Sequence, residues 1–353
     1  MRMDVAPYPQ AMLQRERDAG CPPTSGQSRL VFLFVFALLG AAVHAADIRI
    51  LIPLYAYPEW YRPASYIWDD VARSASRVPI TAVINPDSGP GAGFPNSDYA
   101  RGLADLAAGG VTIAGYVHSS YGLRDLQEVT HDVDQYTNSP LVTAIFVDET
   151  APDTSSLAYY RDLYTHIHSR MNFSAVIVNP GTPIAEEYLS QGAADTAVVF
   201  ENDTGWSNYV ADAYVTNYPA NRFSVLVHGC PDDEAMRRDV DIAVHRNVGW
   251  IYVTDDGLPN PWDSLPPYWD ALVDHVAAYR SLRATGIAVT NGTVKLTFSA
   301  VPNRPSRVEW RSALTAAAWA PLTGALTPTG TVIEATDAST AAARYYRLRL
   351  LQP

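Results

Sequence analysis

Residues 141–149 read Leu-Val-Thr-Ala-Ile-Phe-Val-Asp-Glu, an apolar run that ends in two consecutive carboxylates. A second run, residues 197–200 (Ala-Val-Val-Phe), ends in the same way at Glu201. Runs of this kind are typical of strands that are buried on both faces, as in parallel sheets. Acids at the ends of such strands indicate carboxylate chemistry at the open end of a barrel, because the carboxyl ends of barrel strands form the active face.

The run at 141–147 is one of eight, and segments long enough for helices lie between them. In the segment 156–170, Leu157, Tyr160, Tyr164 and Ile167 recur at steps of three and four, which indicates one face of a helix. We predict strands at 48–54, 80–84, 111–117, 141–147, 175–178, 196–200, 223–227 and 248–253, and helices that include 98–108, 156–170, 232–246 and 268–284.

Eight strands that are each followed by a helix, over roughly 240 residues, predict an α/β fold of the (β/α)8 TIM barrel type. The alternative is a doubly wound open sheet. That fold normally begins with a glycine-rich phosphate loop after its first strand, and residues 55–60, Tyr-Ala-Tyr-Pro-Glu-Trp, are unlike such a loop.

Both ends of the chain differ from the barrel segment, which we place at 46–284. Residues 1–45 read as a signal peptide: Arg29 precedes an apolar run, and Val43-His44-Ala45 has the small residues that signal peptidase requires. The run is shorter than the about 20 residues that span a bilayer. We expect cleavage after Ala45, a secreted protein and no stable membrane anchor; a retained signal-anchor is the alternative.

The segment 285–353 is predicted to be a small all-β domain. Residues 285–298 alternate around Asn291-Gly292, which is a strong hairpin signal, and 307–311, 331–335 and 344–350 read as further strands. We expect Trp310 and Trp319 to be core aromatics of this domain, because Trp is usually largely buried; the alternative is that they stack on sugar rings.

Composition narrows the possible partners. The net charge of −12 over 353 residues argues against nucleic acid, which selects basic surfaces. Only one of the two cysteines, Cys230, lies beyond the predicted signal peptide, so no internal disulfide is expected. A chain of this kind depends on its core for stability, and we expect a monomer.

The predicted strand ends carry the side chains that a sugar polymer requires. Aromatic rings pack on the C–H faces of pyranoses, amides and acids bind hydroxyls, and two carboxyl groups can cleave a glycosidic bond. No excess of Arg or Lys occurs there, which argues against a phosphate or carboxylate substrate. We predict Asp148, Glu149 and Glu201 as catalytic residues, and as substrate-binding residues Tyr55, Tyr57, Asn85, Ser88, Tyr116, His118, Tyr121, Asn179, His228, Asp255 and Trp262.

Other acids and histidines have simpler interpretations. Asp153 and Asp232 precede predicted helices and read as N-caps. His166 and His168 stand two apart on a predicted helix and face different directions, so they make a poor metal pair. The spacing of His118 and His228 is not diagnostic of a metal site. We predict no metal and no cofactor.

Four motifs together resemble the spherulation-specific family 4 (spherulin-4). They are Pro-Leu-Tyr-Ala-Tyr-Pro at 53–58, Asn-Pro-Asp-Ser-Gly-Pro-Gly at 85–91, Gly-Tyr-Val at 115–117 with Tyr121-Gly122, and Phe-Val-Asp-Glu at 146–149. The resemblance covers residues 48–280. It implies a secreted barrel hydrolase that cuts α-1,4-linked N-acetylgalactosamine in galactosaminogalactan-type exopolysaccharides, with Asp148, Glu149 and Glu201 as its site acids and a polysaccharide as its partner.

The substrate that the resemblance implies limits the mechanism. An acetamido group at C2 attacks only when it is trans to the leaving group, and in an α-linked N-acetylgalactosamine it is cis. We therefore expect Asp148 to act as nucleophile or base, Glu201 as general acid/base, and Glu149 to tune the pair and bind substrate. Strand parity lets only one of Asp148 and Glu149 point inward unless the strand has already ended.

Two other classes of function stay open. One is a barrel that binds polysaccharide without cutting it. The other is a metal-dependent polysaccharide deacetylase or lyase.

Overall fold

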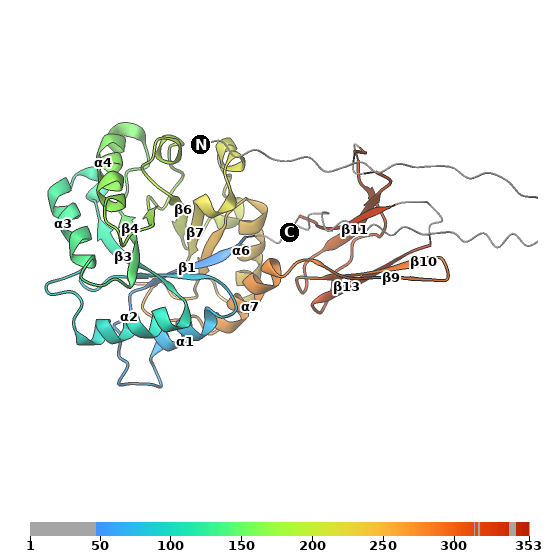
Figure 1. Ribbon diagram of the computed structural model, residues 1–353, viewed down its shortest axis with the longest axis horizontal. Helices are drawn as coiled ribbons and strands as arrows, with labels where there is room; N and C mark the ends of the chain where they lie inside the picture. Colours follow the sequence, from blue (N-terminus) through green and yellow to red (C-terminus); the bar gives the residue numbers. More distant parts are fainter. Residues whose placement is uncertain (1–46, 314, 317, 339–343, 353) are drawn as a thin grey trace, which may run out of the picture. The chain divides into compact units, whose positions relative to one another are not determined.

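The computed structural model describes residues 47–352, apart from 314, 317 and 339–343, and its central feature is a closed barrel of eight parallel strands (Figure 1). The predicted signal peptide lies outside the described residues. The strands are β1 (Arg49–Leu54), β2 (Ile80–Ile84), β3 (Thr112–His118), β4 (Val142–Asp148), β5 (Ala175–Val178), β6 (Thr196–Asn202), β7 (Phe223–Val227) and β8 (Trp250–Val253). Strand β1 closes the ring by pairing with β8, so that Ile50 lies opposite Ile251. The predicted barrel is confirmed, and its closure excludes the open sheet.

Helices connect most of the strands and lie around the barrel. They are α1 (Ile67–Ser74), α2 (Ser97–Gly109), α3 (Leu126–Tyr136), α4 (Leu157–His168), α5 (Glu187–Ser190), α6 (Asp233–His245) and α7 (Trp269–Arg280). Among the described helices we find none with the length and hydrophobicity of a membrane span.

One connection departs from the expected strand–helix alternation. Between β6 and β7 the described chain forms three short 3-10 segments and no α-helix; they are η3 (Trp206–Asn208), η4 (Ala213–Asn217) and η5 (Ala220–Arg222). Gly205 has a left-handed backbone (φ 94°), and Pro219 lacks the N–H that a helix interior needs. These two residues interrupt the segment at both ends.

Large aromatic side chains fill the layer between the strands and the helices. Trp68 of α1, Tyr136 of α3 and Tyr160 of α4 are among the largest fully buried residues. The Tyr136 hydroxyl donates to the carbonyl oxygen of Tyr116 at 2.9 Å, so its polar end is satisfied inside the core. A glycine makes this packing possible, because a Cβ on Gly115 of β3 would lie 2.7 Å from the Tyr136 ring.

We predict that Gly115→Ala destabilises the barrel. The added methyl group overlaps Cγ and the two Cδ atoms of the Tyr136 ring, and overpacking of this kind costs about 1–3 kcal/mol. Gly330→Ala is the matched control, because nothing lies within 4 Å of a Cβ built there. Urea unfolding midpoints measure both variants. A Gly115→Ala protein as stable as the control would contradict the tight packing of β3 against α3.

The C-terminal region folds into two antiparallel sheets of three strands each, as the predicted all-β character requires. One has the order β13-β10-β9 and the other β12-β11-β14, with bounds β9 (Ala284–Thr290), β10 (Thr293–Ser299), β11 (Ser306–Arg311), β12 (Ala320–Pro321), β13 (Val332–Asp337) and β14 (Tyr345–Leu350). Asn291 and Gly292 form the predicted hairpin turn, both with positive φ.

The expectation that Trp310 and Trp319 are core aromatics is wrong. Neither is buried. Arg344 lies over Trp310 at 3.6 Å from the ring centre, and Arg311 and Arg347 lie over Trp319 at 4.4 and 4.5 Å. Guanidinium groups cover these rings through cation–π contacts, and aliphatic and Phe side chains such as Phe298 and Leu348 form the core instead.

Candidate active site

Asp148 of β4 and Glu201 of β6 meet through one side chain from the strand between them. Asn179 directly follows β5, and its amide nitrogen donates to Asp148 Oδ1 at 2.8 Å and to Glu201 Oε2 at 2.6 Å. The amide oxygen accepts from the Gly181 N–H at 3.0 Å, which sets the orientation of the amide. The two acceptor oxygens therefore lie no farther apart than the sum of the two contacts, about 5.4 Å. The structure brings three of the predicted residues into one site.

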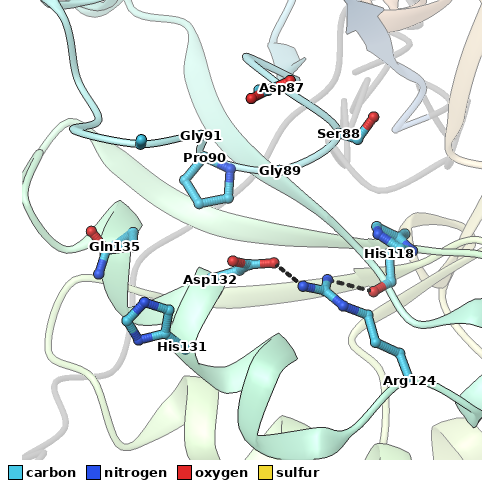
Figure 2. Close-up of a pocket in the computed structure, with 11 residues that line it drawn as sticks. Asp87, Ser88, Gly89, Pro90, Gly91, His118, Arg124, His131, Asp132 and Gln135 are labelled. Atoms are coloured by element: carbon cyan, nitrogen blue, oxygen red, sulfur yellow. Dashed lines mark hydrogen bonds and ion pairs between the residues drawn. The ribbon is translucent and has the colours of Figure 1, made fainter.

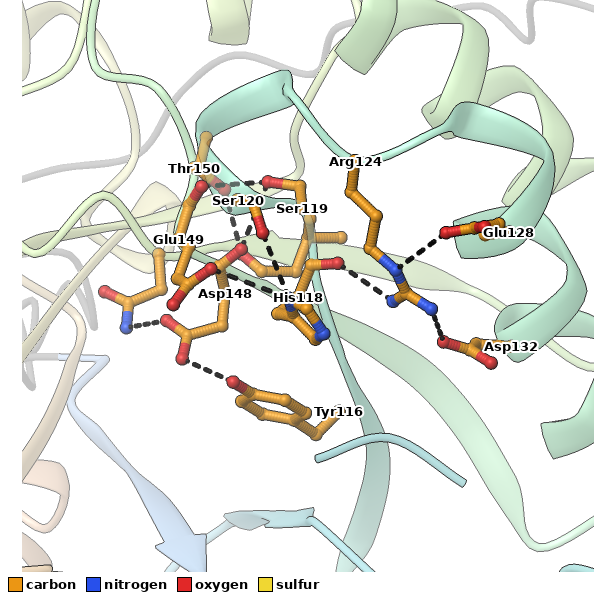
Figure 3. A network of polar contacts seen from close by, with 12 residues as sticks. Tyr116, His118, Ser119, Ser120, Arg124, Glu128, Asp132, Asp148, Glu149 and Thr150 are labelled. Atoms are coloured by element: carbon orange, nitrogen blue, oxygen red, sulfur yellow. Dashed lines mark hydrogen bonds and ion pairs between the residues drawn. The ribbon is translucent and has the colours of Figure 1, made fainter. Parts of the chain in front are cut away.

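Asp148 is partly buried and receives several hydrogen bonds (Figure 3). The Tyr116 hydroxyl donates to Asp148 Oδ2 at 2.8 Å, and the Asn179 amide donates to Oδ1. Burial raises the pKa of Asp148 above its ordinary value, whereas the donors from Tyr116, Asn179 and the Glu149 backbone oppose the rise. The carboxyl group is thus held in one orientation by groups that favour its ionised form.

Glu201 has a different environment. Burial is the largest cause that raises the pKa of Glu201, to about 7; the Asn179 hydrogen bond lowers it and the charge of Asp148 raises it further. A carboxyl group with such a pKa is about half protonated at pH 7, so a large fraction is in the state that a general acid requires.

We predict that Glu201→Gln stabilises the protein at pH 8 but not at pH 4. The pKa of Glu201 is higher in the folded chain, so the folded state binds more protons than the unfolded state and stability falls as the pH rises from about 4.5 toward 7. The neutral amide removes this loss, which is about 1–3 kcal/mol, or a few degrees of Tm.

Thermal unfolding at the two pH values measures this difference. Glu234→Gln, an exposed acid in the first turn of α6, serves as the control. An equal effect of Glu201→Gln at both pH values would show that the carboxyl group does not carry the raised pKa.

Glu149 resolves the question of strand parity. Strand β4 ends at Asp148, and Glu149 has a left-handed backbone with φ 50°. Its side chain therefore does not follow the alternation of the strand. Its Oε2 lies 3.5 Å from Nδ1 of His118, which is the last residue of the neighbouring strand β3. The Glu149 side chain is 43% exposed, so it lies on the open side of the site while Asp148 lies in its floor.

Left-handed backbone conformations gather around these acids. Among the described non-glycine residues with positive φ, three are asparagines, which adopt this conformation readily, and the other four are Ser88, Ser120, Tyr121 and Glu149. All four lie in loops that follow β2, β3 or β4. The Tyr121 N–H donates to the Glu149 carbonyl oxygen at 2.6 Å, so the β3 and β4 loops hold each other in this conformation. Strained backbone of this kind concentrates at functional sites.

A cavity of about 480 Å³ opens beside Glu201, and we call it the Glu201 cavity. Its lining includes four further predicted residues, Tyr55, Asn85, His228 and Trp262. His228 is 7% exposed, packs edge-on against Trp262 and has no hydrogen-bond partner at Nδ1 in the described structure. Burial lowers the pKa of His228, so the ring is neutral near pH 7 and offers one donor and one acceptor.

Figure 2 shows a second cavity of about 470 Å³, the His118 cavity. The loop 87–92 and residues of α3 line it, together with the predicted residue His118; Ser88 lies in that loop. Arg124 donates to the His118 carbonyl oxygen at 3.2 Å and to Asp132 Oδ2 at 2.7 Å, and so ties His118 to α3. Because Glu149 Oε2 lies 3.5 Å from His118 Nδ1, this cavity adjoins the acids through His118.

Five predicted substrate-binding residues line neither cavity; Tyr116 and Asn179 bind Asp148, and the other three lie away from the acids. The Tyr57 hydroxyl donates to Asp98 at 2.7 Å, Tyr121 is 56% exposed on η1 (Ser120–Gly122), and Asp255 is exposed beyond the end of β8. A strand end thus places a residue on the correct face of the barrel, but loop conformation decides whether it turns inward.

The simpler interpretations given above for Asp153, Asp232, His166 and His168 hold. Asp153 and Asp232 cap helices through their side chains. His166 pairs with Asp134 and His168 with Asp195. Cys230 is buried, and burial raises the pKa of its thiol to about 12. Within the described residues, no group of three or more His, Cys, Asp or Glu side chains is arranged to hold a metal ion.

Sequence reasoning missed two parts of the site. One is the loop after β8, where Leu258, Pro259, Asn260 and Pro261 line the Glu201 cavity. The other is the group of Arg124, His131 and Asp132 in the His118 cavity. The proline-rich loop was a usable signal, because it follows a barrel strand directly. The α3 residues carried no such signal, because they follow a 3-10 turn and not a strand.

Comparison with known proteins agrees with this geometry. The sequence profile of Spherulation-specific family 4 matches residues 49–276. Spherulin-4 of Physarum polycephalum is 32% identical over 254 residues, which are 66% of this chain and 74% of that protein. Among solved structures, Aspergillus clavatus Sph3 in complex with GalNAc is 27% identical, and the match covers 65% of this chain and 97% of that one with a TM-score of 0.57.

Proposed function

Because the chain belongs to the spherulation-specific family 4, we propose that it is a secreted glycoside hydrolase that cleaves α-1,4-linked N-acetylgalactosamine or galactosamine polysaccharide. The observation that carries the proposal is the partly buried pair of Asp148 and Glu201, whose nearest carboxylate oxygens the Asn179 amide holds no more than about 5.4 Å apart. The likeness to a structure that contains GalNAc supports the class of sugar. The cavity beside Glu201 and the cavity at His118 have room for units of a chain.

The bridge through Asn179 favours a retaining mechanism, because it holds one oxygen of Asp148 and one of Glu201 no more than about 5.4 Å apart. Carboxyl groups about 5–5.5 Å apart are typical of retaining glycosidases, whereas inverting enzymes need roughly 6.5–9.5 Å to admit a water. An α-linked N-acetylgalactosamine has its acetamido group cis to the leaving group, so the nucleophile has to come from the protein.

The environments of the two acids suggest their roles. Glu201, with a pKa of about 7, donates its proton to the glycosidic oxygen while an Asp148 oxygen attacks C1 from the opposite face. The leaving sugar departs as an alcohol, and a covalent glycosyl–Asp148 ester remains. Glu201 then takes a proton from water, whose oxygen displaces Asp148 and regenerates the α-anomer. Glu149, beside His118, binds substrate and adjusts the charge of the pair.

The proposal is tested on the polymer itself. The purified chain is incubated with α-1,4-galactosamine-rich polysaccharide, and the products are followed by mass spectrometry and by proton NMR of the anomeric signals. We expect oligosaccharides whose first-formed reducing ends are α. Binding without release of reducing ends would identify a non-catalytic barrel, and β-anomers would contradict the role of Asp148 as nucleophile.

Variants of the two acids are expected to separate their roles. Glu201→Gln loses about 10²–10⁴-fold in kcat on the polymer, because protonation of the leaving group is lost. It loses far less in kcat/KM on an aryl glycoside whose leaving group needs no proton, because kcat/KM reports the first step alone. Asp148→Asn loses activity on both substrates. Glu234→Gln, the exposed control, keeps its activity on both. Undiminished polymer cleavage by Glu201→Gln would exclude it as the acid.

The pH dependence provides an independent test of the same assignment. The first step needs protonated Glu201, so kcat/KM on the polymer should fall tenfold per pH unit above about 7. With an activated aryl glycoside, the Glu201→Gln variant should lack this alkaline limb. A fall in kcat/KM at the same pH in that variant would assign the alkaline limb to a group other than Glu201.

A further inference from the structure

Two aromatic side chains on the loop between β1 and α1 stay exposed although they are large. Trp60 is 42% exposed and Tyr61 is 51% exposed. Their ring centroids lie 5.8 Å apart in an edge-to-face arrangement. Neither residue lines the Glu201 cavity or the His118 cavity, so the site described above does not use them.

Trp60 is held in place by its polar edge. Trp60 Nε1 donates to Asp98 Oδ1 at 3.0 Å, and the Tyr57 hydroxyl donates to Asp98 Oδ2 at 2.7 Å. Asp98 lies in the first turn of α2, whose N-cap Asn96 accepts from the Asp98 N–H. A carboxylate fixed in a helix thus positions Trp60 and Tyr57, and Tyr61 packs edge-to-face against the Trp60 ring.

The start of the loop is also anchored. Trp68 Nε1 of α1 donates to the Ala56 carbonyl oxygen at 3.0 Å. Pro58 packs closely on α2, where a Cβ on Gly102 would lie 2.8 Å from the Pro58 Cβ. The exposed rings are therefore presented by a loop that is fixed on both α1 and α2 (Figure 1).

The position of this loop matches that of the active site. It follows the carboxyl end of β1, and Asp98 lies at the N-terminus of α2, which follows the carboxyl end of β2. Strand ends of this kind form the face on which Asp148 and Glu201 also lie. A polymer chain bound at the acids can therefore extend along the same face toward Trp60 and Tyr61.

We propose that Trp60 and Tyr61 form a second glycan-binding surface, outside the catalytic site, that holds a distant segment of the polysaccharide chain; this inference rests on the proposed function. Ring faces pack against the C–H faces of pyranoses. Arg101 lies over the Trp60 ring at 5.7 Å, and Arg62, paired with Glu59, lies over the Tyr61 ring at 5.8 Å. The rings stay about half exposed beside these guanidinium groups, which can donate to the hydroxyls of a sugar that packs on the exposed area.

A protein partner fits this surface less well. A stable protein interface buries about 800 Å² on each side, and two half-exposed rings flanked by charged groups offer much less apolar area. A single sugar chain needs only such a narrow contact, and the surrounding charged side chains suit hydroxyl groups better than they suit an apolar interface.

The test compares binding with turnover in the full chain. Trp60→Ala/Tyr61→Ala and the ring-preserving Trp60→Phe/Tyr61→Phe are made with and without Glu201→Gln. Affinity gel electrophoresis in α-1,4-galactosamine-rich polysaccharide measures binding of the inactive forms, and steady-state kinetics measures the active ones on the polymer and on a short oligosaccharide. Met171→Ala is the control, because it removes an apolar side chain that is fully exposed. Melting temperatures confirm folding.

We expect the double alanine variant to bind the polymer roughly tenfold more weakly and to show a raised KM on the polymer alone, with the Phe variant close to wild type. An effect no larger than that of Met171→Ala overturns the inference. An equal loss on the short oligosaccharide also overturns the inference, because it would place the rings in the catalytic cleft. A molar mass that depends on protein concentration, and no longer does so in the double alanine variant, overturns it too, because it would identify a contact between copies.

The inference and the proposed function fail separately. Polymer that binds through Trp60 and Tyr61 without being cut refutes the hydrolase and leaves the surface intact. Polymer that is cut equally well by the alanine variant refutes the surface alone. A wild-type chain that neither binds nor cuts the polymer overturns both.

Discussion

One amide group organises the centre of this protein. Two carboxyl groups that are buried within about 5.4 Å of each other repel when both are ionised, and each needs donors in place of water. The Asn179 amide supplies a hydrogen to each acid, and its oxygen is already engaged by Gly181. The backbone of Asn179 is equally constrained, because its N–H donates to Val147 and its carbonyl accepts from Thr150. The spacing of the acids therefore follows from the way in which the ends of β4 and β5 pair.

Unequal hydrogen bonding then distinguishes the two acids. Asp148 receives donors from Tyr116, Asn179 and the Glu149 backbone, whereas Asn179 is the hydrogen-bond donor that lowers the pKa of Glu201. Burial raises the pKa of both groups, and more hydrogen-bond donors oppose that rise at Asp148 than at Glu201. Different environments for two neighbouring acids are how one site contains both a nucleophile and a proton donor.

The loops around the acids are fixed by contacts with each other. Ser119 is fully buried; its hydroxyl donates to the Glu149 carbonyl oxygen at 2.8 Å and also lies 2.8 Å from the Tyr160 hydroxyl of α4. These contacts, together with the Tyr121–Glu149 backbone bond, hold residues in left-handed conformations that cost free energy locally. The buried barrel provides the stability against which such strain is maintained. The resulting site is preorganised on rigid strands and has adjustable residues only at its open side.

The amino-acid sequence by itself determined the barrel and the face on which the site lies. Apolar runs, helical periodicity and the acids at strand ends are local patterns, and their physical cause, burial of both faces of a parallel sheet, acts on each segment separately. The tertiary structure alone decided which strand-end side chains meet. Tyr57 turns to Asp98, Glu149 leaves the strand alternation in a left-handed turn, and Arg124 enters the site from beyond a 3-10 turn. Side-chain direction and loop conformation depend on partners tens of residues away, and no local pattern in the sequence records those partners.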